Sequence, residues 1–313
     1  MKKLLRSLAV CSILATLLIV SGCDQLKSTL NKNGGGTTNT LLRDDNSIAI
    51  ASFNIQVFGQ SKLKKKEAMD VLAKVVRHFD VVAIQEVRST SQDVLPKFIK
   101  LINADGSRYD FVIGPRLGRT SSKEQYAYVY DTNRIGFIAG SEYTAPNPGD
   151  QMHRAPFVAS FQAKSSSAGR PFSFTLINIH TDPDETKQEL DALDDVFVYV
   201  QNRNRNEDDV ILLGDLSVSE KKLGQLGQLP NIDWVVKGES TNTRGNKSYD
   251  NIVFNKRTTI EYTGKAGVMN LLETFDLTMD EALQVSDHMP VWAVFSVQEG
   301  GAQVASRPDA TAR

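Results

Sequence analysis

Two apolar segments, separated by a stretch with the pattern of one helix, constrain the fold of this 313-residue chain more than any other feature. Residues 51–59 and 81–88 are each runs of apolar and β-branched residues that end in polar ones, as a buried strand does when it reaches the edge of a sheet. Residues 64–78 repeat apolar side chains at helical spacing. The sequence therefore predicts a strand, a helix and a strand in succession, typical of α/β chains, with Asn54 and Glu86 at the sheet edge.

The rest of the chain combines short strands with two further helices. We expect helices at 92–103 and 185–202. The predicted strands are at 109–113, 126–131, 136–143, 157–163, 172–180, 210–214, 251–255 and 289–297. Because no linker interrupts residues 47–298, we expect one domain of sheets packed together and flanked by helices. Residues 299–313 lack periodicity and are predicted to be disordered.

The N-terminus has the pattern of a secretory signal. A basic start precedes an apolar run at 8–20, which is short for a bilayer span and ends in Val20-Ser-Gly-Cys23. This ending resembles a bacterial lipobox, so we expect residues 1–22 to be a signal peptide and Cys23 to be the lipidated first mature residue. The polar residues 23–46 would form a flexible linker. The alternative is an uncleaved anchor helix that ends in cysteine by chance. The expected location is the bacterial cell envelope, with the protein lipid-anchored and facing the periplasm or the exterior.

Cysteine content and charge limit the ligands. The two cysteines are Cys11, inside the predicted signal, and Cys23, so the domain has no thiol for a disulfide or a zinc–thiolate site. A metal site must then use oxygen and imidazole ligands, which favours magnesium, calcium or manganese. The formal net charge is −1, and loss of the three basic residues of the signal leaves about −4. Without an overall basic field, the domain needs a local patch or metal ions to bind a polyanion.

Six polar clusters at strand ends carry the candidate chemistry. They are Asn54, Glu86, His180-Thr-Asp182, Gly214-Asp215, Tyr249-Asp250-Asn251 and Ser286-Asp-His288-Met-Pro290. Any one of them is more often a cap or a turn than a catalyst. Together they contain two of the four histidines and several carboxylates. Hydrolysis of a phosphodiester needs such a set, because the attacking water loses a proton, the leaving oxygen gains one and a cation offsets the phosphoryl charge.

These motifs, in their order, resemble the endonuclease/exonuclease/phosphatase superfamily and, within it, the deoxyribonuclease I group. The similarity extends from about residue 48 to residue 295. The motifs that carry it are Phe53-Asn-Ile-Gln-Val-Phe-Gly59, Gln85-Glu-Val-Arg88, Leu117-Gly-Arg-Thr-Ser-Ser-Lys-Glu-Gln-Tyr126, His153-Arg-Ala-Pro156, Ile179-His180, Leu213-Gly-Asp215, Ser248-Tyr-Asp-Asn251 and Ser286-Asp-His-Met-Pro290. The resemblance implies an α/β fold, namely a four-layer αββα sandwich of two mostly antiparallel sheets. It also implies cleavage of DNA with little sequence specificity.

The resemblance further implies a role for each matched residue. His180 with Glu124 and His288 with Asp250 correspond to two proton-transfer pairs, and which histidine is the base and which the acid stays open. Asp215 corresponds to an acid beside the scissile phosphate.

The resemblance also implies that the site binds a divalent cation. Asn54, Glu86 and Asp287 match the residues around it, and their oxygens suit Mg²⁺ or Mn²⁺, with Ca²⁺ as a further candidate. The expected partners are DNA and, through the lipid, a membrane. We expect a monomer with no protein partner.

The resemblance also assigns DNA contacts. Arg88, Arg119 and Arg154 match positions that touch phosphates or reach the minor groove, a role that suits the planar guanidinium, and Tyr249 matches one that stacks on a sugar. The alternative for each arginine is a solvated surface position. Ser217 is also expected at a phosphate, although the family usually has asparagine there. Loss of one transition-state donor costs roughly 3–4 kcal/mol, so this departure bears on the level of activity.

Two other functions stay open. One is a phospholipase or sphingomyelinase of the same superfamily, and the other is a weakly active or non-catalytic DNA-binding relative, which Ser217 would explain. The chain also lacks the disulfides of the secreted animal enzymes, so the loop at 220–238 is expected to be mobile. Of the remaining histidines, His78 is expected on a helix surface and His153 along the groove.

Overall fold

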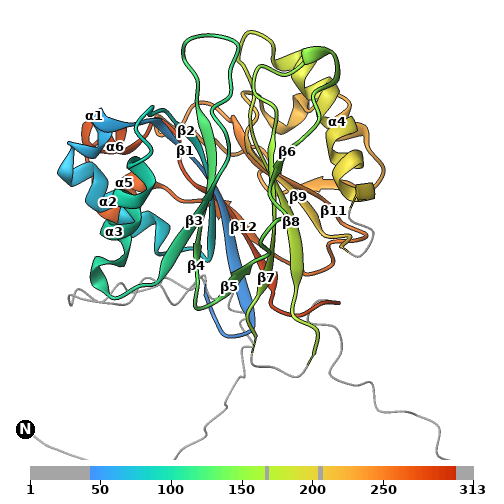
Figure 1. The fold of residues 1–313 in the computed structure, drawn as a ribbon, viewed down its shortest axis with the longest axis horizontal. Coiled ribbons are helices and arrows are strands. Elements are labelled where there is room, and N and C mark those ends of the chain that lie inside the picture. The colour runs from blue at the N-terminus through green and yellow to red at the C-terminus, as the bar shows by residue number, and fades with distance from the viewer. Residues whose placement is uncertain (1–42, 166–168, 204–206, 301–313) are drawn as a thin grey trace, which may run out of the picture. The chain divides into compact units, whose positions relative to one another are not determined.

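Two sheets packed face to face form the centre of the computed structural model, which describes residues 43–165, 169–203 and 207–300 (Figure 1). The first sheet has the strand order β12-β13-β1-β2-β4-β3. The second has the order β10-β11-β9-β8-β7-β5, with β6 paired to β7. Helices cover the outer face of each sheet (Figure 1). These layers confirm the predicted α/β fold, a four-layer αββα sandwich.

The elements have the following bounds. The first sheet contains β1 (Ser47–Phe58), β2 (Val81–Val87), β3 (Tyr109–Ile113), β4 (Gln125–Asp131), β12 (Tyr262–Val268) and β13 (Val291–Ser296). The second contains β5 (Ile135–Phe137), β6 (Tyr143–Thr144), β7 (Phe157–Ala163), β8 (Ser173–His180), β9 (Val210–Asp215), β10 (Ile232–Trp234) and β11 (Asp250–Asn255). The helices are α1 (Gln60–Leu63), α2 (Lys66–Val76), α3 (Val94–Ile102), α4 (Thr186–Arg203), α5 (Leu271–Phe275) and α6 (Met279–Val285).

Strand β1 is buried on both of its faces. Its residues Ala49, Ala51 and Phe53 belong to the core beneath the helices, whereas Ile48 and Ile50 belong to the core between the sheets. Successive side chains of a strand point to opposite faces, so a strand between two cores reads as one continuous apolar run. This pattern explains why the sequence predicts the strand correctly.

Three apolar cores hold the layers together. The first lies between the first sheet and helices α1, α2, α3, α5 and α6, the second between the two sheets, and the third between the second sheet and α4. The middle core is rich in aromatic rings. Within it, the hydroxyl of Tyr128 donates to the carbonyl oxygens of Phe157 (2.7 Å) and Leu176 (3.0 Å), which satisfies the polar end of a buried ring.

Toward one end of the sandwich, the side chains between the sheets change from apolar to polar. The Nε2 of Gln85 on β2 donates to Ser52 Oγ on β1 (3.2 Å) and to Asn178 Oδ1 on β8 (2.7 Å). The Nδ2 of Asn178 donates in turn to the carbonyl oxygens of Ile84 (3.2 Å) and Ala127 (3.1 Å). These buried bonds connect the two sheets and separate the apolar core from the polar strand ends beyond.

Several element boundaries differ from the sequence prediction. The helix expected at 64–78 is two helices, α1 and α2, and the strand expected at 136–143 is two short strands, β5 and β6. Strands β10 and β12 and helices α5 and α6 were not predicted. Strand β10 and helices α5 and α6 are short, and β10 and β12 are only partly buried, so these elements carry little hydrophobic periodicity.

His78 does not lie on a helix surface as expected. It is buried, its Nδ1 lies 2.8 Å from the carbonyl oxygen of Lys74, and its ring packs edge-on against Phe275 at 5.8 Å. Phe275 belongs to α5, a helix that was not predicted from the sequence. In the loop at 220–238, Leu223 and Leu226 are buried in the core beneath α4. Mobility of that loop stays a prediction.

Parts of the sequence prediction fall outside the described residues. These are the signal at 1–22, Cys23, the linker up to residue 42 and the tail from residue 301. Between residues 43 and 300, apart from the two short gaps, no helix is both long and apolar enough to span a membrane.

Candidate active site

Three adjacent strands of the second sheet place His180, Asp215 and Asp250 side by side. In the parallel pair β8 and β9, His180 lies opposite Asp215, and in the antiparallel pair β9 and β11, Asp215 lies opposite Asp250. In their strands these residues continue the inward-facing series of the core, which includes Leu213 and Ile252. The three polar side chains therefore form one row that faces the first sheet.

Asp215 lies at the centre of the site and is 4% exposed. Its Oδ2 accepts a hydrogen bond from Asn54 Nδ2 (3.0 Å) and lies 3.6 Å from His180 Nε2 and 3.5 Å from His288 Nε2. Its Oδ1 accepts from the backbone N–H of Ser217 (2.9 Å). Burial opposes ionisation, but His288, His180 and these hydrogen bonds hold the pKa of Asp215 below its ordinary value. Asp215 is therefore a carboxylate toward which both imidazoles are turned.

His180 forms the first histidine–carboxylate pair with Glu124, whose side chain is fully buried. His180 Nδ1 lies 2.8 Å from Glu124 Oε1, and Arg154 Nε lies 3.1 Å from the same oxygen. Burial would lower the pKa of His180, but Glu124 and Asp215 raise it above its ordinary value. Burial would raise the pKa of Glu124, but His180 and Arg154 hold it below. The carboxylate at Nδ1 fixes the tautomer and leaves Nε2 facing the site.

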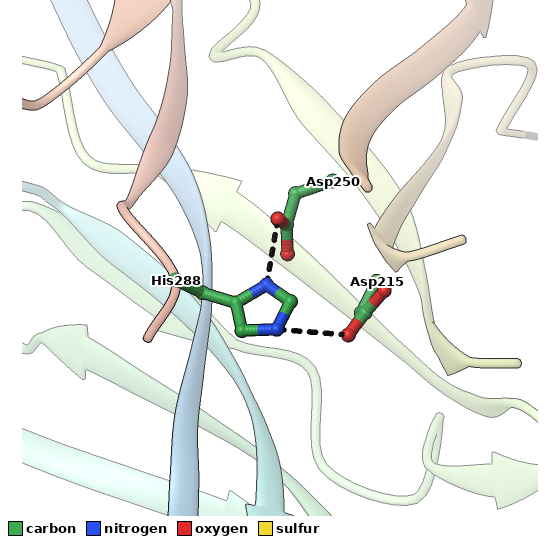
Figure 2. A group of neighbouring side chains, drawn as sticks. All are labelled: Asp215, Asp250 and His288. Atoms are coloured by element: carbon green, nitrogen blue, oxygen red, sulfur yellow. Dashed lines mark hydrogen bonds and ion pairs between the residues drawn. The ribbon is translucent and has the colours of Figure 1, made fainter. Parts of the chain in front are cut away.

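His288 forms the second pair with Asp250 (Figure 2). Its Nδ1 lies 2.9 Å from Asp250 Oδ2, and that oxygen also accepts from Thr241 Oγ1 (2.7 Å). Burial would lower the pKa of His288, but Asp250 and Asp215 raise it well above its ordinary value. Burial also raises the pKa of Asp250, against the effect of His288. Figure 2 shows the imidazole of His288 between two carboxylates, which repeats the arrangement around His180.

Each pair joins one sheet to the other. Glu124 precedes β4 and His288 precedes β13 in the first sheet, whereas His180 ends β8 and Asp250 begins β11 in the second. The two hydrogen bonds from Nδ1 therefore cross the interface between the sheets. As a consequence, the geometry of the site depends on how the sheets pack.

The expected metal-binding residues lie at the ends of β1 and β2. Glu86 has a φ of +62°, a left-handed conformation that non-glycine residues rarely adopt. Its Oε1 accepts from Asn54 Nδ2 (3.2 Å) and its Oε2 from the backbone N–H of Val57 (2.8 Å). The side-chain oxygen Oδ1 of Asn54 accepts from the N–H of Gln56 (2.9 Å), so Asn54 turns its NH₂ group toward Glu86 and Asp215. Whether Asn54 also contacts a cation stays a prediction.

Asp287 is the third expected metal-binding residue, and its Oδ1 lies 3.9 Å from His288 Nε2. Its Oδ1 is buried and has no hydrogen-bond partner among the residues that the structure describes. Burial and Lys65 lower the pKa of Lys62 to about 8, and Asp287 and Glu86 oppose that shift, so both carboxylates lie near the Lys62 ammonium. Hard carboxylate oxygens of this kind suit Mg²⁺ or Mn²⁺. The residues present thus fit the expected ion.

A second group of ligand atoms comes from Asp215, Asp250 and His288, which lie within 4.8 Å of one another. These side chains already pair among themselves. Both oxygens of Glu86 are paired as well, so the expected cation at Glu86 and Asp287 stays a prediction.

Two of the expected DNA-contacting arginines are partly exposed. Arg88 Nε lies 3.2 Å from Glu86 Oε2 and its Nη2 lies 3.4 Å from Glu124 Oε2, so it connects the metal-binding residues to the first pair. Arg119 forms an ion pair with Glu185 at the surface. Exposed ion pairs contribute little to stability, so Arg119 is available to a phosphate. Tyr249, also expected to touch DNA, has its ring 5.6 Å from that of His288.

Arg154 lies deeper than the sequence analysis expected, with 5% of its surface exposed. Besides its ion pair with Glu124, it donates from Nε (3.1 Å) and Nη2 (3.0 Å) to the carbonyl oxygen of His180. In this structure the guanidinium contacts both Glu124 and the backbone of His180, and its contact with DNA stays a prediction. Ser217 turns its hydroxyl toward the carbonyl oxygen of Thr181 (3.3 Å).

Two supporting residues were not predicted. Thr241 holds Asp250, and Tyr126 accepts the backbone N–H of His180 at its hydroxyl oxygen (2.9 Å). Tyr126 belongs to an inward series with Tyr128 and Tyr130, a spacing of two that could have indicated its direction. Thr241 lies in an irregular loop and has no comparable signal in the sequence.

Comparisons with known proteins agree with this geometry. The sequence profile of the Endonuclease/Exonuclease/phosphatase family matches residues 51–288. Deoxyribonuclease gamma of Rattus norvegicus is 32% identical over 279 residues, which cover 83% of this chain and 88% of the relative. Deoxyribonuclease-1-like 1 of Cricetulus griseus is 36% identical over 254 residues, or 77% of this chain and 82% of the relative. The solved structure of the human Nocturnin catalytic domain with bound sulfate anion shares the fold, with a TM-score of 0.55 and 15% identity over 80% of this chain and 93% of that one.

Proposed function

The chain belongs to the Endonuclease/Exonuclease/phosphatase family, within its deoxyribonuclease I-like group, and on that premise we propose that it is a divalent-metal-dependent endonuclease. The proposed reaction is hydrolysis of DNA phosphodiester bonds with little sequence preference. One observation carries the proposal: two imidazoles, each held by a carboxylate at Nδ1, turn their Nε2 atoms toward Asp215.

The two imidazoles supply the two proton transfers that hydrolysis needs. In the proposed reaction, a water oxygen bonds to the phosphorus while the bond from phosphorus to the leaving ester oxygen breaks. One imidazole accepts the proton of the water at Nε2, and the other donates its Nε2 proton to the leaving oxygen. Glu124 and Asp250 keep the Nδ1 protons in place and stabilise each imidazolium. The arrangement is nearly symmetric about Asp215, so the assignment of base and acid is left to experiment.

Glu86 and Asp287 would hold the cation in this reaction. A bound Mg²⁺ or Mn²⁺ supplies positive charge that offsets the charge on the phosphoryl oxygens. Asn54 would orient the carboxylates, because its NH₂ group donates to both Glu86 and Asp215.

DNA is the proposed substrate. The rat and hamster relatives are named deoxyribonucleases, and the partly exposed Arg88 and Arg119 offer donors for phosphates. If Arg119 binds a phosphate away from the reacting bond, Arg119→Ala should raise the KM for plasmid DNA and leave kcat unchanged. An unchanged KM would remove Arg119 from the contact surface.

We further propose that Cys23 carries lipid and holds the domain outside the cytoplasm. The support is the sequence Val20-Ser-Gly-Cys23 after an apolar run. Mass spectrometry of the mature N-terminus should find an acylated Cys23, and Cys23→Ser should abolish that modification. A mature chain that begins elsewhere, or that keeps residues 1–22, would contradict the lipoprotein assignment.

The nuclease proposal is tested with supercoiled plasmid and the full-length protein in MgCl₂, MnCl₂ or EDTA. Nicked circles are expected with either metal and not with EDTA. Glu86→Gln should increase the metal concentration that half-maximal nicking requires, whereas the matched change Glu273→Gln, at an exposed position of α5, should not. Absence of nicking with every metal would contradict the proposed activity, and nicking in EDTA would contradict the metal requirement.

A further inference from the structure

The end of the sandwich opposite the active site contains four carboxyl groups that the proposed reaction does not use. Asp209 precedes β9 of the second sheet and Glu207 lies two residues before it, whereas Glu261 precedes β12 and Glu299 follows β13 of the first sheet. Strand β9 is six residues long, so Asp209 lies about 20 Å from Asp215 at the other end of the strand. The cluster is therefore separate from the active site.

Three of these carboxylates converge. Oxygen atoms of Asp209, Glu261 and Glu299 all lie within 4.8 Å of one another, and Asp209 and Glu261 are only 1% and 2% exposed. Two other carboxylate oxygens of the cluster accept hydrogen bonds. Ser173 donates from its backbone N–H (2.9 Å) and its hydroxyl (3.0 Å) to Glu299 Oε1, and the N–H of Gly300 donates to Glu261 Oε1 (2.6 Å). Calcium–oxygen distances of 2.3–2.6 Å place the ligands of one ion about 3–5 Å apart, which is the spacing found here.

Three buried oxygens in this cluster lack a hydrogen-bond partner among the described residues. They are Asp209 Oδ1, Glu261 Oε2 and the hydroxyl oxygen of Thr259. The hydroxyl of Thr259 nevertheless lies close to the carboxyl of Asp209, and the carboxyls of Asp209 and Glu261 lie close to each other. Buried polar atoms are usually hydrogen-bonded, so these three oxygens have coordinating capacity that the described residues do not use. All three can coordinate a cation.

No positive side chain balances this charge within the described residues. No lysine, arginine or histidine there forms an ion pair with any of the four carboxylates. Burial first, and then Glu261 and Glu207, raise the pKa of Asp209 to about 9, and burial raises the pKa of Glu207 to about 7. A bound cation would offset the charge of these buried carboxylates.

We propose that Asp209, Glu261 and Glu299, together with the hydroxyl of Thr259, bind a calcium ion. Calcium accepts irregular sets of carboxylate and hydroxyl oxygens from separate segments, whereas magnesium requires near-octahedral geometry at 2.0–2.1 Å and keeps several waters. Because the ligands come from both sheets, the ion stabilises the packing of the sandwich at the end opposite the active site. It has no part in the proposed hydrolysis.

Thermal unfolding of the full-length protein, first freed of metal with a chelator, tests this site. CaCl₂ at about 100 times its dissociation constant should raise the Tm by roughly 5–10 °C, and MgCl₂ at the same concentration should raise it less. The shift should persist in Glu86→Gln, which removes a metal ligand of the active site. It should be lost in Asp209→Asn and in Glu261→Gln, but not in Asp45→Asn, a matched change at an exposed position.

Asp209→Asn and Glu261→Gln should fold, so loss of the calcium-dependent shift in them can be assigned to the site. In chelator, Asp209→Asn should be at least as stable as the unchanged protein, since it removes a buried and unbalanced carboxyl group. Calorimetric titration with CaCl₂ in the Glu86→Gln background should find one ion, and none once Asp209→Asn is added. No calcium-dependent shift, or a shift that survives Asp209→Asn and disappears in Glu86→Gln, would overturn the proposal.

Discussion

The carboxylate at Nδ1 of each imidazole sets the pH at which that imidazole exchanges a proton. Glu124 raises the pKa of His180, so Glu124→Gln should lower it. The limb of the pH profile of kcat/KM that His180 governs should then move to lower pH, whether that limb is acidic or alkaline. The value of kcat should fall by about 10²-fold or more, because the glutamine no longer favours the imidazolium.

The measurement is plasmid nicking between pH 5 and 9 at constant ionic strength. The limb that moves identifies the role of His180, since an acidic limb belongs to a base and an alkaline limb to an acid. Glu273→Gln serves as the matched control. If both limbs of the profile stayed at the same pH in Glu124→Gln, or if one moved to higher pH, Glu124 would not raise the pKa of His180.

Ser217 is a second position at which we expect one residue to affect the rate. Its φ of +54° lies in the left-handed region, which asparagine tolerates better than serine does, and its N–H already donates to Asp215. Ser217→Asn should therefore raise both the Tm, by a small amount, and the nicking rate, by up to about 10²-fold, because the amide adds a donor for the phosphate.

Ser217→Gly separates the two effects. Glycine relieves the same backbone conformation but brings no amide. If Ser217→Asn and Ser217→Gly nick DNA equally fast, the side chain at this position does not contact the phosphate.

The sequence predicts which residues meet in the candidate site better than it predicts how deeply each of them is buried. The motifs select His180, Asp215 and His288, and the structure places their imidazoles and carboxylate together. The burial of Arg154 could not be predicted, because it follows from the position of Glu124, which is distant in sequence from Arg154 and close to it only in the fold.

At the scale of elements, the alignment of β8 with β9 depends on Gly214. A Cβ at this position would lie 1.9 Å from the carbonyl oxygen of Ile179, its partner on β8, and its φ is +157°. Gly214→Ala should force the strands apart, lower the free energy of unfolding by about 3 kcal/mol or more, and displace Asp215 from His180.

Chemical denaturation and plasmid nicking measure this prediction together. Gly136→Ala on β5 is the matched control, because the nearest atom to its added Cβ is 3.7 Å away. If Gly214→Ala were as stable and as active as Gly136→Ala, the close approach of the two strands would not matter for the site.

The buried helices and strands are easier to predict from the sequence than the partly exposed ones. Strand β1 and helix α2 have long apolar patterns and are found in the sequence, although the separation of α1 from α2 at Lys64 and Lys65 is missed. Strand β12 is partly exposed along its whole length and contains Gly264 at a φ of +80°. Its sequence therefore shows neither alternation of apolar and polar residues nor a high strand propensity.

In the whole molecule, the candidate active site forms only where the two sheets pack together. Each histidine–carboxylate pair takes one residue from each sheet, and Gln85 and Asn178 link the sheets directly beneath. The order of motifs indicates the four-layer fold, because that order accompanies one fold in the family it resembles. Which histidine meets which carboxylate follows from that resemblance alone, since the spacing in sequence does not reveal which strand ends face each other.

The central claim is that two imidazoles from opposite sheets share the proton transfers of one hydrolytic reaction. The most direct test compares the rates at which His180→Ala, His288→Ala and the unchanged protein nick supercoiled plasmid at saturating MgCl₂, with Tm measured to establish folding. Each variant should nick about 10²- to 10⁴-fold more slowly, and the double variant should lose little more than either alone. A folded single variant that nicks DNA within about tenfold of the unchanged rate would contradict the claim.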